Sequence, residues 1–238
     1  MTWIVVAAVA GLLLGPLLRA QVFVHTVPAG ESWRRDCPHC AARLNGAFLP
    51  PTGRCPHCRG RIGPPPGVVE VVAAVALAVV AWRVHEPLPL LAVGWVALFG
   101  VVLAHVDVAV HRLPDRLTFP AAGGALVLFG LSAVVGGEWG RLASAVACAA
   151  ALAAFYLVLV LVSPNGMGFG DAKAALCVGL VAGWFGWGVA VAAALAGFLL
   201  AGLYATALLL LRRVGRKDHI AHGPFLLLGV LAAIAALG

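Results

Sequence analysis

The sequence predicts an all-α membrane protein, a polytopic bundle of about eight transmembrane helices with a small cytoplasmic insertion patterned like a zinc ribbon. Of its 238 residues, 63% are hydrophobic and only 11% are charged, whereas average soluble domains carry about 25% charged residues. The apolar residues form runs of roughly 18 or more, the length that spans a bilayer as a helix. A soluble fold is excluded because a globule of this size could not cover so much apolar surface.

Eight apolar segments follow one another along the chain. They lie at about residues 3–23, 67–83, 88–106, 118–136, 141–163, 172–187, 188–211 and 222–237. The first has no basic region before it, so we expect a retained helix and not a cleaved signal peptide. The sixth and seventh share a short Gly- and Trp-rich turn at residues 183–187, which leaves seven spans open as an alternative.

The basic residues predict the orientation. Arg19 lies inside the first segment, and Arg83 and Arg141 lie in loops on one side. The other 13 of the 16 Lys and Arg residues fall in loops on the opposite side: Arg34, Arg35, Arg43, Arg54, Arg59, Arg61, Arg112, Arg116, Lys173, Arg212, Arg213, Arg216 and Lys217. By the positive-inside rule that side is cytoplasmic, and both termini face outward. The net charge of +7 is therefore expected to meet anionic lipid headgroups, and no nucleic acid partner is expected.

These features divide the chain into three parts. Residues 1–24 are expected to form the first transmembrane helix, residues 25–66 a cytoplasmic zinc-binding domain with four cysteines, and residues 67–238 a seven-helix domain. The middle part is too short to form a hydrophobic core unaided. Domains of that size usually need a metal ion or disulfides.

The middle part contains two C-x-x-C pairs, which 14 residues separate. Each pair can form a tight knuckle that directs two thiolates at one ion, and two knuckles complete a tetrahedron around Zn²⁺. Such a closed site would fold the domain and would not catalyse. Disulfides or a redox pair are the alternatives, although disulfides fit a cytoplasmic loop poorly. The expected ligands are Cys37, Cys40, Cys55 and Cys58, with His39 and His57 as alternative ligands and Cys148 and Cys177 as apolar fillers of the spans.

Three acidic residues lie in a span or at its cytoplasmic edge: Glu70, Asp107 and Asp171. An ionisable group there costs a few kcal/mol, which makes each one a functional candidate. The predicted topology puts Asp107 and Asp171 at the same edge, on different helices. If they meet, they share a proton. One could then take a proton from water while the other protonates the scissile amide, which is general acid–base hydrolysis.

Glycines precede the second aspartate, at positions 166, 168 and 170. Gly166, Gly168 and Gly170 permit positive φ and close backbone approach. Such a segment could lie beside an extended substrate strand, which a protease needs because peptide bonds inside helices resist hydrolysis.

A simpler interpretation of both aspartates stays open. Asp171 could cap the N-terminus of the sixth segment, where its side-chain acceptor and the helix dipole favour it. Asp107 could pair with His105, His111 or Arg112 at the interface.

The chain resembles the type IV prepilin peptidases, which are GxGD-type aspartyl proteases. The order of elements is similar over nearly the whole chain: one span, a cytoplasmic loop with two C-x-x-C pairs, then seven spans. The motifs that carry the resemblance are Asp107-x6-Pro114-Asp115-x2-Thr118, Gly168-Phe169-Gly170-Asp171-x-Lys173, Val68-Val69-Glu70 and Gly223-Pro224-Phe225-Leu226.

The resemblance implies a reaction and a substrate class. Family members cut the short basic leader from prepilins and pseudopilins after a Gly, at the cytoplasmic face of the bacterial inner or plasma membrane. Asp107 and Asp171 match the two catalytic aspartates. We expect Gly168, Gly170 and Lys173 to position the substrate.

Many members also N-methylate the new N-terminus with S-adenosylmethionine, to which no residue of this chain can be assigned. The family's Gly-Ser-Phe-Leu-Asn segment reads Gly-Pro-Leu-Leu-Arg at residues 15–19, so methyltransferase activity stays open. Asp115 matches an acid that is not catalytic, and Ala109 replaces a common acid.

Two functions from other classes compete with proteolysis. A transporter would use Asp107 and Asp171 as ion sites, but it predicts acids near the midplane and internal repeats. A non-catalytic scaffold would bind a partner through its zinc domain, but it leaves the two acids and the glycines as coincidence.

Overall fold

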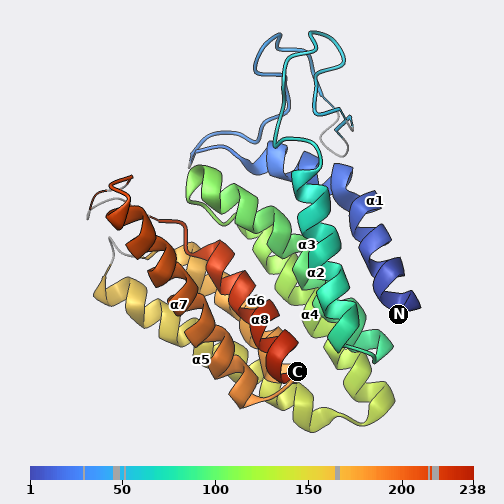
Figure 1. The fold of residues 1–238 in the computed structure, drawn as a ribbon. Coiled ribbons are helices and arrows are strands. Elements are labelled where there is room, and N and C mark those ends of the chain that lie inside the picture. The colour runs from blue at the N-terminus through green and yellow to red at the C-terminus, as the bar shows by residue number, and fades with distance from the viewer. Residues whose placement is uncertain (29, 45–48, 51, 164–166, 214, 216–219) are drawn as a thin grey trace.

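The protein is all-helical in the part of the chain that its computed structural model describes, residues 1–28, 30–44, 49–50, 52–163, 167–213, 215 and 220–238. Gly166, Arg216 and Lys217, which the sequence analysis used, lie outside these residues. Eight helices occur in the described residues (Figure 1): α1 (Thr2–His25), α2 (Val68–Arg83), α3 (Pro87–Val110), α4 (Asp115–Gly136), α5 (Trp139–Val162), α6 (Phe169–Trp184), α7 (Trp187–Leu210) and α8 (Gly223–Leu237).

The eight apolar segments are eight separate helices, as predicted. The sixth and seventh are distinct because α6 ends at Trp184 and α7 begins at Trp187. Between them Gly186 has a φ of +117°, a conformation that glycine adopts without the steric cost of a Cβ. The sixth helix begins at Phe169, earlier than its apolar run suggested, so Asp171 lies in its first turn.

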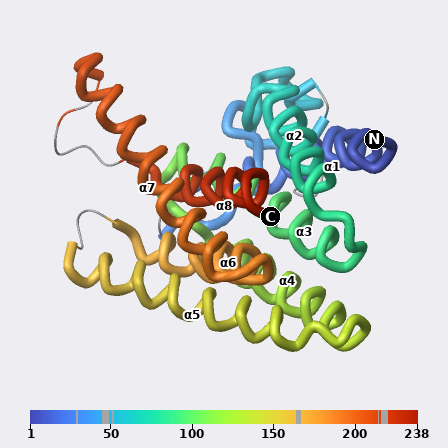
Figure 2. The backbone as a smooth tube through the Cα atoms, turned by 60° about the horizontal axis from the view of Figure 1, so that its bottom comes forward, coloured from blue at the N-terminus to red at the C-terminus, as the bar shows by residue number. Residues whose placement is uncertain are grey.

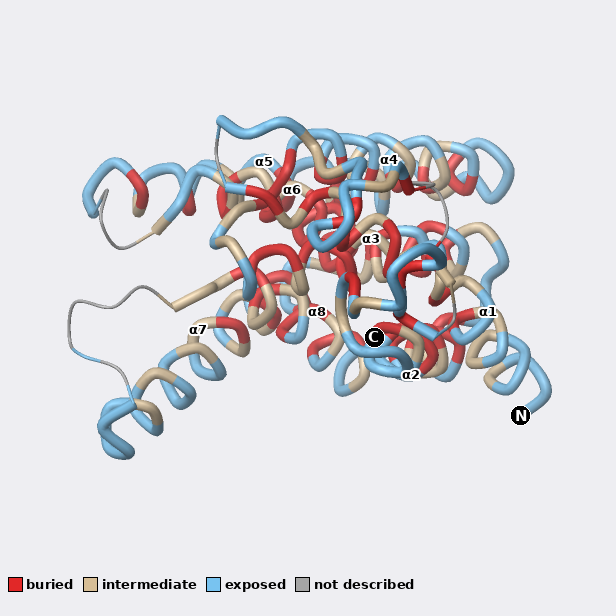
Figure 3. The backbone as a smooth tube through the Cα atoms, turned by 90° about the horizontal axis from the view of Figure 1, so that it is seen from above, coloured by how far each residue is buried: buried red, intermediate tan, exposed pale blue. Residues whose placement is uncertain are grey.

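The helices differ in length and in burial. Five of the described helices, α1, α3, α4, α5 and α7, are long and apolar enough to cross a membrane. Helices α2 and α6 have 16 residues and α8 has 15. At 1.5 Å per residue these lengths are about 22–24 Å, less than the roughly 30 Å hydrocarbon core. Helix α6 is buried along most of its length (Figure 3). Helix α8 lies in the middle of the bundle and contacts α2, α3, α6 and α7 (Figure 2).

Small residues allow the helices to pack closely. A Cβ on Gly11 of α1 would lie 2.6 Å from Cα of Ala74 in α2. Likewise, a Cβ on Gly179 of α6 would collide with the backbone of Ala149 in α5. Association in a bilayer depends on such contacts, because lipid tails are as apolar as the side chains they would replace.

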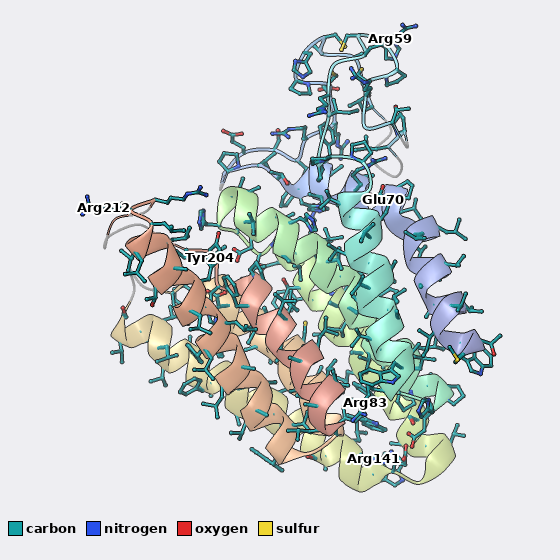
Figure 4. The ribbon with its side chains drawn as sticks, viewed as in Figure 1. Arg59, Glu70, Arg83, Arg141, Tyr204 and Arg212 are labelled. Carbon is teal, nitrogen blue, oxygen red and sulfur yellow. The ribbon has the colours of Figure 1, made fainter. Side chains whose placement is uncertain are left out.

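The two ends of the bundle carry different groups. The cysteine-containing segment projects from the end where α1 stops and α2 starts, and both termini lie at the other end (Figure 1). Arg59 and Arg212 lie toward the first end, whereas Arg83 and Arg141 lie at the second (Figure 4). The loops that hold most of the basic residues therefore share one end, as the topology argument requires.

Glu70, one of the three costly acids, forms a buried ion pair with Arg19 of α1. Its Oε1 lies 3.4 Å from Nη1 of Arg19, whose side chain is 0% exposed. Its Oε2 accepts a 2.9 Å hydrogen bond from the N–H of Gly67, which caps α2. Nη2 of Arg19 donates to the carbonyl of Pro50. Glu70 thus joins α1, α2 and the intervening segment, a structural role.

We predict that Glu70→Gln destabilises the protein by about 3–5 kcal/mol, because the substitution leaves the buried Arg19 charge without its carboxylate. Thermal unfolding in detergent should show a clearly lower midpoint. Glu86→Gln is the matched control, because Glu86 pairs with Arg141 in an exposed position at the opposite end of the bundle and such pairs contribute little. Equal midpoints for the two variants would contradict the prediction.

Candidate functional site

The first candidate carboxyl group, that of Asp107, is held by the start of another helix. Asp107 lies in the last turn of α3 and is 5% exposed. Its Oδ2 accepts a 3.0 Å hydrogen bond from the N–H of Gly223, the first residue of α8. A Cβ on Gly223 would lie only 2.8 Å from that oxygen, so glycine is required for this approach. The positive end of the α8 dipole also favours the carboxylate there.

The second candidate, Asp171, occupies the third position of α6. It is 8% exposed, and its Oδ2 accepts a 3.2 Å hydrogen bond from the N–H of Gly168. The capping role that stayed open for Asp171 is therefore real. Capping uses only one carboxyl oxygen of Asp171, so the other oxygen is still available for acid–base catalysis.

The glycines before Asp171 matter because one of them allows α6 to pack closely against a neighbouring segment. A Cβ on Gly170 would lie 2.9 Å from Cβ of Leu113, so this glycine lets α6 pack against the loop between α3 and α4. Gly168 is extended, with φ of −90°, and neither Gly168 nor Gly170 has positive φ. Of the two properties that glycine permits, Gly170 therefore uses close approach, and neither Gly168 nor Gly170 uses positive φ.

Both carboxyl groups line one cavity of about 650 Å³. It lies at the end of the bundle from which the cysteine-containing segment projects. Its walls come from the segment after α1, the end of α3, the loop into α4 with the start of α4, the start of α6 and the segment before α8. The lining residues are Trp33, Asp107, His111, Arg112, Leu113, Pro114, Asp115, Arg116, Met167, Gly168, Phe169, Gly170, Asp171, Lys173, Ile220, Ala221 and His222.

The two carboxyl groups line the same cavity and are close enough to interact electrostatically. Within the described residues, Oδ1 of each aspartate has no hydrogen-bond partner, which leaves it available for a water molecule. Of the basic groups that could pair with Asp107, His105 is 2.7 Å from the carbonyl of Val101 and Arg112 donates to that of Pro28. His111 remains an electrostatic neighbour of Asp107. Two adjacent carboxyl groups favour one shared proton, because both cannot ionise cheaply.

Lys173 lies on the same cavity wall but is already paired. Its Nζ lies 2.6 Å from Oδ1 of Asp115, and the two side chains are 37% and 56% exposed. An exposed pair of this kind contributes little to stability. The pair links the first turns of α4 and α6 beside the two aspartates.

The four predicted zinc ligands converge. Their Sγ atoms all lie within 4.8 Å of one another, and none is in a disulfide. The Sγ–Sγ distances are 3.7 Å for Cys37–Cys58 and 3.8 Å for Cys40–Cys55. A tetrahedral ion with Zn–S bonds of about 2.3 Å requires sulfur atoms about 3.8 Å apart. The geometry therefore fits zinc.

The two cysteine knuckles have the same backbone. The N–H of Ala41 bonds to the carbonyl of Cys37, and that of Arg59 to the carbonyl of Cys55, both at 2.9 Å. Ala41 and Arg59 both have left-handed φ, at 55° and 58°. Backbone N–H groups, that of Cys58 foremost, lower the pKa of the Cys55 thiol to about 6. His39 is not among the converging groups, because its Nε2 lies 3.0 Å from the carbonyl of Arg61.

The cysteine-containing segment reaches the cavity through Trp33. The Trp33 ring lies 4.7 Å from that of His25, and the guanidinium groups of Arg112 and Arg116 lie 4.9 and 6.0 Å from its centre. No pattern in the sequence indicated a role for Trp33. Contacts with one ring and two guanidinium groups therefore hold Trp33 at the edge of the cavity.

Two further residues at the site escaped the sequence analysis, His222 and Tyr156. His222 lines the cavity and bonds to the buried hydroxyl of Tyr156. One signal was available. A tyrosine within an apolar span needs a partner for its hydroxyl, but no local pattern identifies that partner.

Comparison with known proteins gives one consistent result. Residues 94–237 match the model of the type IV leader peptidase family. Three similar proteins are each named prepilin leader peptidase/N-methyltransferase. The Pseudomonas putida protein is 27% identical over 94% of this chain and 87% of its own length. The Dichelobacter nodosus protein is 29% identical over 68% and 58%, and the Aeromonas salmonicida protein 31% identical over 81% and 68%. No solved structure matches the chain significantly.

Proposed function

This chain belongs to the type IV leader peptidase family, and we propose that it is a membrane aspartyl endopeptidase that removes the leader peptide of prepilin-like precursors at the cytoplasmic membrane face. The resemblance drawn from the motifs is confirmed by the family match. One observation carries the proposed mechanism. Asp107 and Asp171, from two different helices, are both buried and both line one cavity.

Hydrolysis needs only these two carboxyl groups and a water molecule. The ionised carboxyl group takes a proton from the water as its oxygen attacks the scissile carbonyl carbon. The protonated group gives its proton to the carbonyl oxygen, which forms a diol. The first group then gives the proton it took from water to the leaving nitrogen. The C–N bond breaks as a diol hydroxyl returns its proton to the second group. The N–H groups of Gly223 and Gly168 each donate a hydrogen bond to one Oδ2. These two bonds fix the orientation of the carboxyl groups, and they can persist throughout the reaction while the Oδ1 atoms exchange protons.

The glycines and Lys173 are proposed to position the substrate. Both main-chain groups of Gly168 are used inside the first turn of α6, so Gly168 would act by keeping the cavity open and not by pairing with a substrate strand. Gly170 keeps Asp171 close to the loop after α3. The ammonium group of Lys173, beside Asp115, would face polar groups of the leader.

The proposed architecture has eight membrane spans, with residues 25–66 as a cytoplasmic zinc domain between the first span and the seven-helix part. Its four cysteines would hold one structural Zn²⁺, because four thiolates leave no position open for substrate. Trp33 connects this domain to the cavity rim. The clustering of basic loops at that end supports the cytoplasmic assignment.

The proposed cleavage can be tested in bacterial membranes. A prepilin whose leader ends in Gly is co-expressed with this protein, and the product is analysed by N-terminal sequencing and mass spectrometry. We expect a single cut after that Gly. The Pseudomonas putida relative serves as the positive control. If the relative processes the substrate and this protein does not, the proposed activity or its substrate class is wrong.

The same mass spectra test methyl transfer, the second activity in the relatives' names. A product heavier by one methyl group on its new N-terminus would establish it. An unmodified N-terminus, with the relative's product methylated in parallel, would restrict this protein to proteolysis. The changed segment at residues 15–19 would then be the first place to examine, because Arg19 there is buried against Glu70.

A further inference from the structure

A partly buried hydrogen bond joins Tyr156 of α5 to His222, the residue before α8. Tyr156 is 0% exposed, and its hydroxyl lies 3.0 Å from Nε2 of His222. Phe198 of α7 packs against both rings, with centroid distances of 5.5 Å to Tyr156 and 5.1 Å to His222. The Tyr156–His222 pair is therefore enclosed by aromatic packing, which restricts both rings to one arrangement.

His222 sets the position of the first turn of α8. Its carbonyl accepts the N–H groups of Phe225 and Leu226, at 3.0 and 3.1 Å. The next residue is Gly223, whose N–H holds Asp107. Pro224 has no N–H, so Gly223 supplies the donor of this turn that reaches the carboxylate. A displacement of His222 would therefore displace the group that orients Asp107.

The pair also lies beside the second aspartate. Tyr156 is an electrostatic neighbour of Asp171, and His222 lines the cavity that both aspartates share.

We propose that Tyr156 and His222 are positioning residues, whose hydrogen bond fixes the start of α8 so that the Gly223 N–H holds Asp107 in register with Asp171. This inference rests on the proposed aspartyl protease function. Neither residue needs to touch the substrate. They act through Gly223, and loss of their bond loosens the geometry of the pair of acids.

The test is Tyr156→Phe, which removes the hydroxyl and keeps the stacked ring. We expect kcat for prepilin cleavage to fall about 10- to 100-fold, the effect of misplacing a catalytic group by a fraction of an ångström to 1 Å. KM should change little, because the groups that bind substrate remain. His222→Ala should behave alike, and His222→Gln, which can still bond to Tyr156, should recover part of kcat.

Two controls separate positioning from packing. Tyr204→Phe removes the hydroxyl of the chain's other tyrosine, which lies on α7 and is 48% exposed, and should keep wild-type kcat. The double variant Tyr156→Phe with His222→Ala should be no slower than the slower single variant, because the two residues act as one unit.

Several results would overturn the inference. One is a wild-type kcat in Tyr156→Phe. Another is a loss of activity no larger than the loss of folded protein seen by size-exclusion chromatography. A third is a double variant whose fall in kcat equals the product of the two single falls. If wild type cleaves, Asp107→Asn does not and Tyr156→Phe is unimpaired, only the positioning role fails. If the wild-type protein does not cleave at all, the proposed function and this inference both fail.

Discussion

Replacing either aspartate by asparagine is expected to lower the rate of leader cleavage by about 10³-fold or more, because general acid–base catalysis by one group contributes up to about 10⁴-fold. Asn keeps an oxygen that can accept the N–H of Gly223 or Gly168, so Asp107→Asn and Asp171→Asn should still fold. Initial rates of prepilin processing in membranes, normalised to the amount of folded enzyme, measure the effect.

The matched control is Asp115→Asn. Asp115 lines the same cavity but is paired with Lys173, so its loss should leave most of the activity. Full processing by either Asp107→Asn or Asp171→Asn would refute the aspartyl mechanism. Equal losses in all three variants would mean that the acids act only through the charge of the cavity.

Loss of the zinc ligands is expected to have the second large effect. Cys37→Ser and Cys55→Ser should each lose about one equivalent of zinc and accumulate poorly. The binding free energy of a structural zinc site is about 10–16 kcal/mol in small zinc domains, and there it is also folding energy. Metal analysis of the purified protein and its yield in membranes measure both effects. Cleavage should fall as well, since Trp33 would lose its place at the cavity rim.

Cys148→Ala is the control for this series. Cys148 is buried in α5, away from the four converging thiols, so the variant should retain its zinc. Unchanged zinc content in Cys37→Ser would show that the four cysteines do not form the site. A normal yield of a zinc-free variant would show instead that the metal does not fold this segment.

Features that depend on neighbouring residues could be predicted from the sequence alone. Apolar runs gave the helices, because the length of a hydrophobic run decides whether it suits a bilayer. The spacing of the cysteines gave the four converging thiols, because each knuckle is a local turn. The basic loops predicted that Asp107 and Asp171 lie at the same end of the bundle, because the distribution of Lys and Arg indicates which loops lie on one side of the membrane.

The tertiary structure alone decided which side chains meet. The Gly223–Asp107 bond joins residues 116 positions apart, and the Tyr156–His222 bond joins residues 66 apart. The Arg19–Glu70 pair likewise turned one suspected functional acid into a structural one. The physical reason lies in the composition of the helices. A helix that is apolar on every side has no periodic pattern to show which face is inside, and small residues decide that face only once a neighbouring helix packs against them.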